Sequence, residues 1–257
     1  MDKRRGLLRL CLIALALMLP CGSLAETARG FDTPEACATA LYESLSRQDT
    51  AAMEACIAFR EMAEQFDFAK YCDRIGAIPI YTTLQPATTS ASIAYNEYEL
   101  KSRWYWRLNN TLMMVNNPAF INYLNGGSTI NKQTEDYQTV MDMYSNPANL
   151  KGLSDLTMTG LLDAAAIPKA GITYASEKNQ QNIKSQLAVW GVTNFRELAI
   201  QLQWNVSSMP GVRYEVLLPL QLIEVKGRWL VNPNGSNVGI IMGISNYYML
   251  GQLPESD

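Results

Sequence analysis

A run of five aromatic and basic residues, Arg103-Trp104-Tyr105-Trp106-Arg107, is the part of this sequence best suited to binding. Aromatic rings beside guanidinium groups can stack on sugar rings or peptides, and arginine adds cation–π and bidentate contacts. Aromatic residues at helical spacing usually belong to a core, so we favour Trp104 facing inward, with Tyr105 and Trp106 packed under neighbouring helices. The candidate ligand-binding residues of this run are Arg103, Trp104, Trp106 and Arg107.

The chain contains no histidine. Histidine is the usual general base near neutral pH and the commonest metal ligand, so Ser-His-Asp triads, Cys-His pairs and histidine-based zinc sites are excluded. Paired carboxylates remain open as catalysts, as in glycosidases. The candidate acids are Glu97, Glu99, Asp155 and Asp163, but none lies in a motif, and a solvated helix face is the simpler interpretation. We therefore predict no catalytic residue, no metal site and no cofactor.

The first 25 residues have the three parts of a cleaved secretory signal. Basic residues at positions 3–9 precede an apolar run ending at Leu19, and Ser23-Leu24-Ala25 offers small residues for a cut before Glu26. The apolar run is about half of the roughly 20 residues that span a bilayer. Pro20 disfavours lipoprotein cleavage at Cys21. We predict a signal peptide (1–25), an exported single domain (26–257) and no transmembrane segment after cleavage.

The net negative charge of the chain disfavours nucleic acids and anionic lipids as binding partners. The whole chain carries a formal charge of −3, and its predicted leader holds four basic residues but one acidic residue. The mature protein is therefore more acidic still. Binding to nucleic acid or to anionic lipid depends on basic patches. We predict no nucleic-acid partner, which leaves an envelope carbohydrate or a protein as the candidate partner.

Three cysteines follow the leader: Cys37, Cys56 and Cys72. Export places them where disulfides can form, so one bridge with one thiol left over is open, in any of three pairings. Each also lies on the apolar face of a predicted helix, where a free cysteine packs as a small hydrophobe. A bridge and no bridge both remain open.

Helical patterns dominate residues 31–190. Thr33 followed by Pro34 predicts a helix start, and Leu100, Trp104 and Leu108 lie along one helical stripe. The apolar periodicity also predicts helices around Met53 to Ile57, over 61–75, 92–114, 153–166 and 176–190, with further helical signals within 118–150. Glu97 with Lys101 and Glu99 with Arg103 are spaced for ion pairs along the helix. Residues 77–84 predict a short edge strand, because Pro79 is poorly tolerated in a central one.

Beyond residue 195, apolar residues recur at every second position. Leu198, Ile200, Leu202 and Trp204 alternate with polar or small residues, which is typical of a half-buried strand. Residues 212–225 predict a long strand, Lys226-Gly227 a tight hairpin, and residues 228–231 the return strand. Together 195–245 predict an antiparallel meander behind a mostly helical N-terminal two-thirds, which is an α+β fold. Trp204 and Trp229 are further candidate ligand-binding residues, directed inward from this meander.

Two segments carry a family resemblance. The opening FDTPEACATALYESLSRQDTAAMEACIAF and the ending YEVLLPLQLIEVKGRWLVNP resemble the two-helix start and the long hairpin of the nuclear transport factor 2-like (cystatin-like) superfamily. The resemblance covers residues 31–60 and 195–232 and implies that the helical span 85–190 is an insertion. The whole chain also resembles uncharacterised exported proteins of Gram-positive gut bacteria. The superfamily includes enzymes and non-catalytic binding modules, so its fold selects no function.

Two functions follow from these observations. The first is a non-catalytic, exported binding or interaction module with a pocket between the meander and the helices. The alternative is a hydrolase or isomerase that uses carboxylates and tyrosine in such a pocket. A cavity holding two carboxylates, or a buried acid beside a tyrosine, favours the enzyme; a filled core favours the module.

Overall fold

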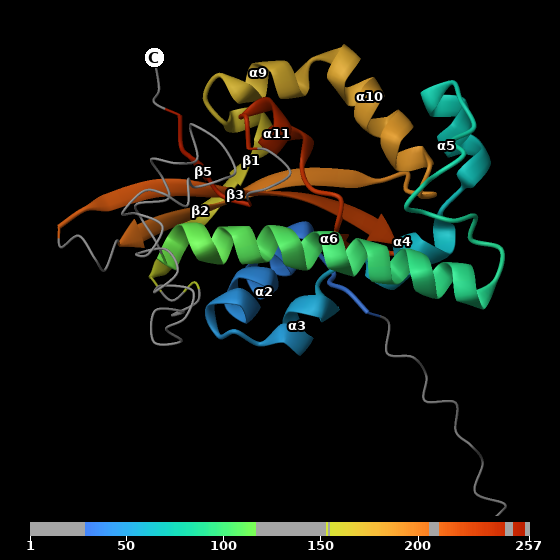
Figure 1. Cartoon of the computed structure of the whole chain (residues 1–257). Helices are drawn as coiled ribbons and strands as arrows, with labels where there is room; N and C mark the ends of the chain where they lie inside the picture. Colours follow the sequence, from blue (N-terminus) through green and yellow to red (C-terminus); the bar gives the residue numbers. More distant parts are fainter. Residues whose placement is uncertain (1–28, 117–152, 154, 206–210, 245–248, 255–257) are drawn as a thin grey trace, which may run out of the picture.

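The computed structural model describes residues 29–116, 153, 155–205, 211–244 and 249–254 (Figure 1). Helices make up most of its N-terminal part and an antiparallel sheet most of its C-terminal part, which confirms the α+β class. The predicted signal peptide and the helical signals within 118–150 lie outside these residues. Within them, no helix has both the length and the apolar character needed to cross a bilayer.

Four short helices open the fold: α2 (Pro34–Ser46), α3 (Thr50–Ala55), α4 (Phe59–Gln65) and α5 (Phe68–Ile75). The predicted start of α2 is confirmed, since the Thr33 hydroxyl accepts a hydrogen bond from the Ala36 N–H at 3.1 Å. The single helix predicted over 61–75 is wrong. Its break falls at Asp67, whose carboxylate accepts from the Lys70 N–H at 3.0 Å and so begins α5 as a separate helix.

The edge strand predicted for residues 77–84 is also wrong, because this segment is an irregular connection between α5 and α6. Three of its side chains, Ile78, Ile80 and Tyr81, are at least 80% exposed, so nothing packs their apolar pattern into a sheet. The long helix α6 (Ser90–Asn116) follows, as the stripe of Leu100 and Trp104 predicted.

The remaining elements are β1 (Leu156–Asp163), η2 (Ala164–Ala166), α9 (Ala170–Ala175), α10 (Glu177–Ala188), β2 (Phe195–Asn205), β3 (Arg213–Val225), β4 (Arg228–Val231), α11 (Asn237–Ile241) and β5 (Gly251–Gln252). The helix predicted over 153–166 is wrong, since β1 pairs antiparallel with β2 from Leu156 opposite Trp204 to Asp163 opposite Leu198. Pairing with a long neighbouring strand overrides the local helical pattern. The span 85–190 therefore contributes a strand to the sheet and is not wholly an insertion.

The sheet has the order β1-β2-β3-β4, with β5 also paired to β3. The predicted hairpin between β3 and β4 is confirmed. Lys226 and Gly227 have φ of 52° and 76°, the positive values that a two-residue turn of this hand requires. The meander was expected to run to residue 245, but it stops at Val231. The apolar segment after it forms α11, which begins where the Ser236 hydroxyl accepts from the Gly239 N–H.

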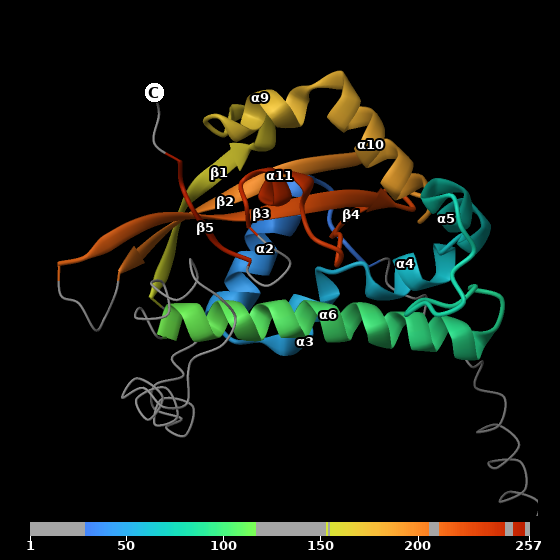
Figure 2. The same cartoon turned by 45° about the horizontal axis from the view of Figure 1, so that its top comes forward.

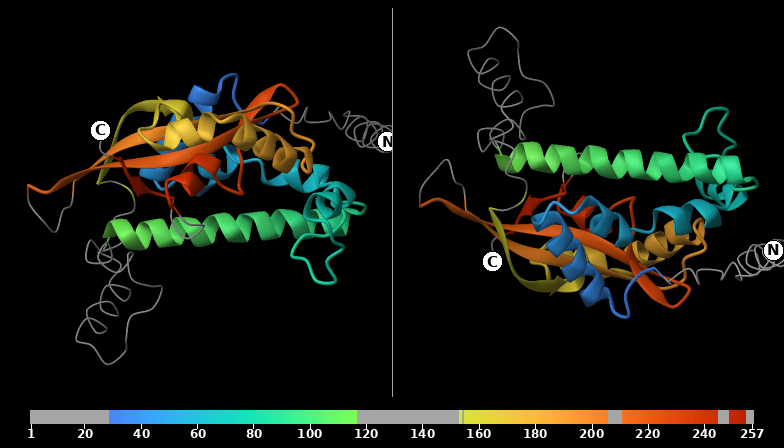
Figure 3. Two further views of the ribbon diagram at one scale, coloured as in Figure 1. Left: turned by 90° about the horizontal axis from the view of Figure 1, so that it is seen from above. Right: turned by 90° about the horizontal axis from the view of Figure 1, so that it is seen from below.

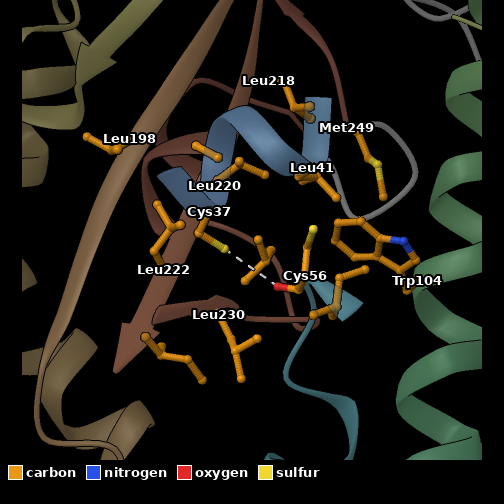
Figure 4. Packing of buried hydrophobic residues seen from close by; sticks show 14 of the residues in the cluster. Cys37, Leu41, Cys56, Trp104, Leu198, Leu218, Leu220, Leu222, Leu230 and Met249 are labelled. Carbon is orange, nitrogen blue, oxygen red and sulfur yellow. Dashed lines mark hydrogen bonds between the residues drawn. The ribbon is translucent and has the colours of Figure 1, made fainter. Parts of the chain in front are cut away.

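Helices cover both faces of the sheet (Figures 1 and 2). Helices α9, α10 and α11 lie on one face, and α2, α3 and α4 lie on the other. Helix α6 runs alongside as a straight rod that packs against α4 (Figure 3). In the core, Cys37 and Leu41 of α2 face Leu220 and Leu222 of β3, and Trp104 of α6 closes this cluster (Figure 4).

One stretch of β3 has no strand along its outer edge within the described residues. Strand β4 pairs with residues 222–225, and β5 pairs with residues 216–217. The stretch between them includes Pro219, which opposes Ala199 of β2 on the inner side. Proline lacks the N–H that a partner strand needs, so its place at an open edge is the one a sheet tolerates.

Candidate functional site

Helix α6 separates the side chains of the aromatic and basic run. Trp104 is buried, as predicted, whereas Trp106 is 48% exposed. Tyr105 is partly buried, and its hydroxyl donates to the Glu54 carboxylate at 2.7 Å. Arg103 and Arg107 lie one helical turn apart on α6. Each lines a different cavity.

Arg107 is a buried cation with no carboxylate partner among the described residues. Only 8% of it is exposed, and its guanidinium donates to the backbone carbonyl of Pro233 and, at 3.3 Å, to that of Arg103. It also lies over the Trp104 ring at 5.9 Å from the ring centroid. Burial, and then the nearby charge of Arg103, lowers the pKa of Arg107 to about 10.

The first cavity, here called the edge recess, lies at the open edge of β3. It is lined by residues of α6, β3, the turn after β4, and α11, among them Trp104, Arg107, Pro219, Gly235 and Gly239. Its volume is about 40 Å³, room for a few water molecules. The edge recess is therefore almost filled by side chains.

The second cavity, here called the end cavity, is larger, at about 230 Å³. It lies where α5, the connection after α5, α6 and α10 meet the end of the sheet, an arrangement visible in Figure 2. Its lining is Tyr71, Arg74, Thr82, Thr83, Leu84, Arg103, Gln186, Leu187, Val189, Trp190, Gln221, Asn232 and Asn234. Among the described residues, this lining holds two arginines and four side-chain amides but no carboxylate.

Aromatic packing sets one wall of the end cavity. Trp190 stacks obliquely on Phe66, with ring centroids 4.9 Å apart, and Tyr71 lies 5.8 Å from the same Phe66 ring. The Asp67 N–H donates to the Val189 carbonyl at 2.8 Å, which ties the start of α5 to the end of α10. On the opposite side, Arg103 donates to the Thr83 hydroxyl and so holds the connection after α5 against α6.

Gln221, Asn232 and Asn234 form a wall shared by the two cavities. The Asn232 amide donates to the Gln221 side-chain carbonyl, and the Gln221 amide donates to Glu197 at 2.8 Å. Glu197 is 1% exposed, so a buried carboxylate anchors this wall from behind.

Glu197 is the buried acid that best fits the enzyme hypothesis, because it lies close enough to a tyrosine to affect its pKa. Burial of Tyr174 and, second, the charge of Glu197 raise the pKa of Tyr174 to about 12. Its oxygens accept from the Gln221 amide, the Ser236 hydroxyl, the Asn237 N–H and side-chain amide, and the Val238 N–H. These donors use the acceptor positions that a carboxylate has. Glu197 lines neither cavity, so its contacts are those of a structural group that fixes the start of α11.

The four acids expected from the sequence lie elsewhere. Glu97 pairs with Lys101 at 3.3 Å, as predicted, while Glu99 and Arg103 form no ion pair. Asp163 pairs with Arg196 at 3.3 Å and begins η2, and neither it nor Asp155 is among the described residues that line the edge recess or the end cavity. In the described part of the chain, no three His, Cys, Asp or Glu side chains gather as metal ligands.

The two further tryptophans do not join Arg103 and Arg107. Trp204 is buried at the far end of β2, 5.6 Å from the Tyr214 ring centroid. Trp229 is half-buried on β4, where its backbone pairs with Phe31. Neither lines the edge recess or the end cavity.

All three cysteines are free thiols in this structure. Cys37 and Cys56 are neighbours in the core, and the Cys37 thiol donates to the Cys56 carbonyl at 3.7 Å (Figure 4). Burial raises the pKa of Cys56 to about 11 and raises that of Cys37 further still. Cys72 lies half-buried on α5, apart from this pair.

Sequence reasoning missed most of the end cavity, since it named Arg103 but not Tyr71, Arg74 or Trp190 as site residues. Tyr71 and Arg74 lie on α5, whereas Trp190 lies in the turn after α10, far along the chain. Gly191 gave a partial signal in the sequence, because a glycine often follows the end of a helix. Its φ is 65°, and it directly follows Trp190 in the turn after α10.

Comparisons with known proteins add little beyond the fold class. No described protein family matches the chain, and no curated protein is similar to it in sequence. A cystatin-like protein from Ruminococcus gnavus is similar in structure, with a TM-score of 0.43 and 11% identity. The alignment covers 87% of this chain and 45% of that one, so the chain spans less than half the length of its structural neighbour.

Proposed function

We propose that this chain is an exported, non-catalytic binding module whose small-molecule ligand occupies the end cavity. The observation that carries the proposal is the composition of that cavity. Two arginines, four amides and two aromatic side chains surround about 230 Å³ of space, and no carboxylate of the described residues lines it. Polar groups of this kind orient a ligand, whereas acid–base catalysis without histidine needs a carboxylate or an equivalent group within reach.

The sequence supports the other parts of the proposal. The leader of residues 1–25 has the parts of a secretory signal, which places the module at the cell envelope or outside the cell. The helices α2 and α3 and the β3–β4 hairpin carry the segments that resemble the nuclear transport factor 2-like superfamily. We therefore propose a divergent member of that superfamily, with its ligand site displaced to the end of the sheet.

Export is tested by intact-mass analysis of the protein from its native host. The expected mass is that of a chain beginning at Glu26. A cytoplasmic protein that keeps residues 1–25 contradicts this part of the proposal.

Ligand binding is tested on the mature chain with a panel of neutral sugars, uronates, amino acids and short peptides, by ¹⁵N NMR. We expect shifts confined to residues around the end cavity, such as Thr83 and the Trp190 indole. The blocking variant is Gln186→Trp, which fills the cavity from α10. The control is Lys184→Trp, because two residues along a helix places the same ring on the opposite, exposed side.

The outcomes separate the hypotheses. Shifts that disappear in Gln186→Trp and persist in Lys184→Trp support a binding module. Conversion of a panel compound to product favours the carboxylate-dependent hydrolase or isomerase. A panel whose members all shift residues outside the cavity, or none, contradicts the proposed site.

A further inference from the structure

The end cavity carries more positive charge than the rest of this acidic protein leads one to expect. The chain has 24 acidic and 21 basic residues, yet Arg74 and Arg103 line the cavity without an acid among its described lining residues. Within the described part of the chain, neither arginine forms an ion pair with a carboxylate. Elsewhere on the same helix, Lys101 has two acid partners, Glu54 at 3.1 Å and Glu97 at 3.3 Å.

A third cation, Arg107, lies behind the shared wall, as does the buried Glu197 carboxylate that Gln221 contacts. Arg107 lies one helical turn from Arg103, and the contacts of its guanidinium with described residues are two backbone carbonyls and the face of the Trp104 ring. An isolated charge in a poorly solvated place is costly unless an opposite charge approaches it. Arg107 lines the edge recess and not the end cavity, so the charge that a ligand in the end cavity would contact is that of Arg74 and Arg103.

Unused hydrogen-bonding groups lie beside the two arginines. The side chains of Gln186 and Asn234 make no hydrogen bond to a described residue, so each offers both a donor and an acceptor to a ligand. Tyr71 and Trp190 supply flat apolar surface in the same wall. A cavity of about 150 Å³ is known to hold a six-membered ring. The 230 Å³ of the end cavity therefore accommodates one as well.

We propose that the end cavity binds an acidic sugar, a pyranose ring that bears a carboxylate. This proposal rests on the proposed binding function and names the ligand class of the same site. Arg103 and Arg74 hold the carboxylate, since guanidinium groups match its two oxygens. Gln186 and Asn234 bind ring hydroxyls, and Tyr71 or Trp190 covers the C–H face of the ring.

The test compares two ligands that differ only in the acid group, D-glucuronate and D-glucose, at constant ionic strength and with sodium acetate as a third titrant. Affinities are measured by calorimetry on the mature chain and checked by NMR. We expect glucuronate to bind at least about tenfold more tightly than glucose and than acetate. Arg103→Gln removes this preference. Arg47→Gln, an exposed arginine on the distant α2–α3 connection, serves as the charge-matched control and keeps it.

Each result is decisive. If glucuronate and glucose bind in the cavity with equal affinity, the acidic-sugar proposal is overturned and the binding module stands. If acetate binds as tightly as glucuronate, the site recognises any small anion and the sugar part is overturned. If none of the three shifts the cavity residues, the acidic-sugar proposal is overturned, and the wider panel then decides the proposed function. Loss of the preference in Arg47→Gln would also reject a specific role for Arg103.

Discussion

The edge recess and the end cavity share a wall, yet one is nearly filled and the other is hollow. Trp104, Met249 and the side chains of β3 occupy the space at the edge recess, so the tryptophan of α6 acts as core (Figure 4). At the end cavity, Trp190 packs sideways on Phe66 and leaves the space beside it open. The lesson is that residue type alone does not mark a site, because similar residues close one cavity and line the other.

The two arginines of α6 show the same contrast. Arg107 lines the nearly filled edge recess and donates to the backbone carbonyl of Pro233. Arg103 donates to the Thr83 hydroxyl and lines the open end cavity. One helical turn therefore separates a structural cation from a candidate ligand-binding one.

The largest expected effect comes from the wall between the cavities. Glu197→Ala leaves the donors of Ser236, Asn237, Val238 and Gln221 buried without their acceptor, which is expected to cost about 3–5 kcal/mol of unfolding free energy. Urea denaturation measures this change. The control Glu215→Ala removes an exposed acid of β3 and should stay within about 0.5 kcal/mol. Equal losses in both variants would show that the buried network does not hold the wall.

Substitution of Gly235 by alanine tests how tightly the edge recess is packed around Arg107. A Cβ there lies 2.7 Å from an Arg107 guanidinium nitrogen, and the backbone has a φ of 103°. We expect Gly235→Ala to cost about 1–3 kcal/mol, from backbone strain at this φ and from displacement of the Arg107 guanidinium away from the Pro233 carbonyl. Gly76→Ala is the matched control, since its φ is also positive, at 68°, and nothing lies within 4 Å. If thermal or urea unfolding finds both variants equally destabilised, the recess is not tightly packed around Arg107.

Alkaline pH probes the core beside Trp104. Burial raises the pKa of Cys56 from 9.0 to about 11, so this thiol stabilises the fold below pH 9 and loses that contribution as pH rises towards 11. Tyr105 and Tyr174, whose pKa values are raised to about 12 chiefly by burial, extend the decline in the same direction. The expected loss from Cys56 is about 2 kcal/mol, measured as unfolding free energy against pH. Because the neighbouring Cys37 thiol, whose pKa is raised further still, contributes in the same direction, Cys56→Ala should reduce the decline without abolishing it. An unchanged slope would contradict burial of the Cys56 thiol.

The smallest effect is expected in the hollow region. Gln186→Leu places an apolar side chain of similar size in the end cavity and should change stability by less than about 0.5–1 kcal/mol. Gly239→Leu adds bulk to the edge recess, where a Cβ on this residue would lie 3.4 Å from Pro219, and should cost about 1–3 kcal/mol. Differential scanning fluorimetry of both variants ranks the two regions directly. If Gln186→Leu loses more stability than Gly239→Leu, the end cavity is packed more tightly than the edge recess, which contradicts the contrast drawn between them.

Local signals predicted much of this fold. Thr33 with Pro34 begins α2, Lys226 with Gly227 turns the hairpin, and the stripe through Leu100 and Trp104 forms α6. Each of these depends on neighbours within a few residues. The errors have the opposite origin, since β1 is a strand only because β2 lies beside it, and the connection after α5 has no partner to make it one.

The candidate site was harder to predict for the same reason. Arg103 was singled out by its aromatic neighbours, but Arg74, Gln186 and Trp190 reach the cavity from α5 and from the end of α10. Their approach depends on how these helices meet the sheet, which no local spacing encodes. The sequence analysis did not single out Glu197, whose buried network depends on contacts with Gln221 of β3 and with the start of α11.

The proline on the open margin of the sheet has a consequence for assembly. Strand β3 is the longest in the sheet, and an unprotected margin on such a strand would invite another polypeptide to pair with it. Here Pro219 offers no amide hydrogen to an incoming chain, and the Gln221 carbonyl already accepts from the Asn232 N–H at 2.8 Å. A second chain that paired along this margin would therefore lack the amide donor at Pro219 and would compete with Asn232 for the Gln221 carbonyl.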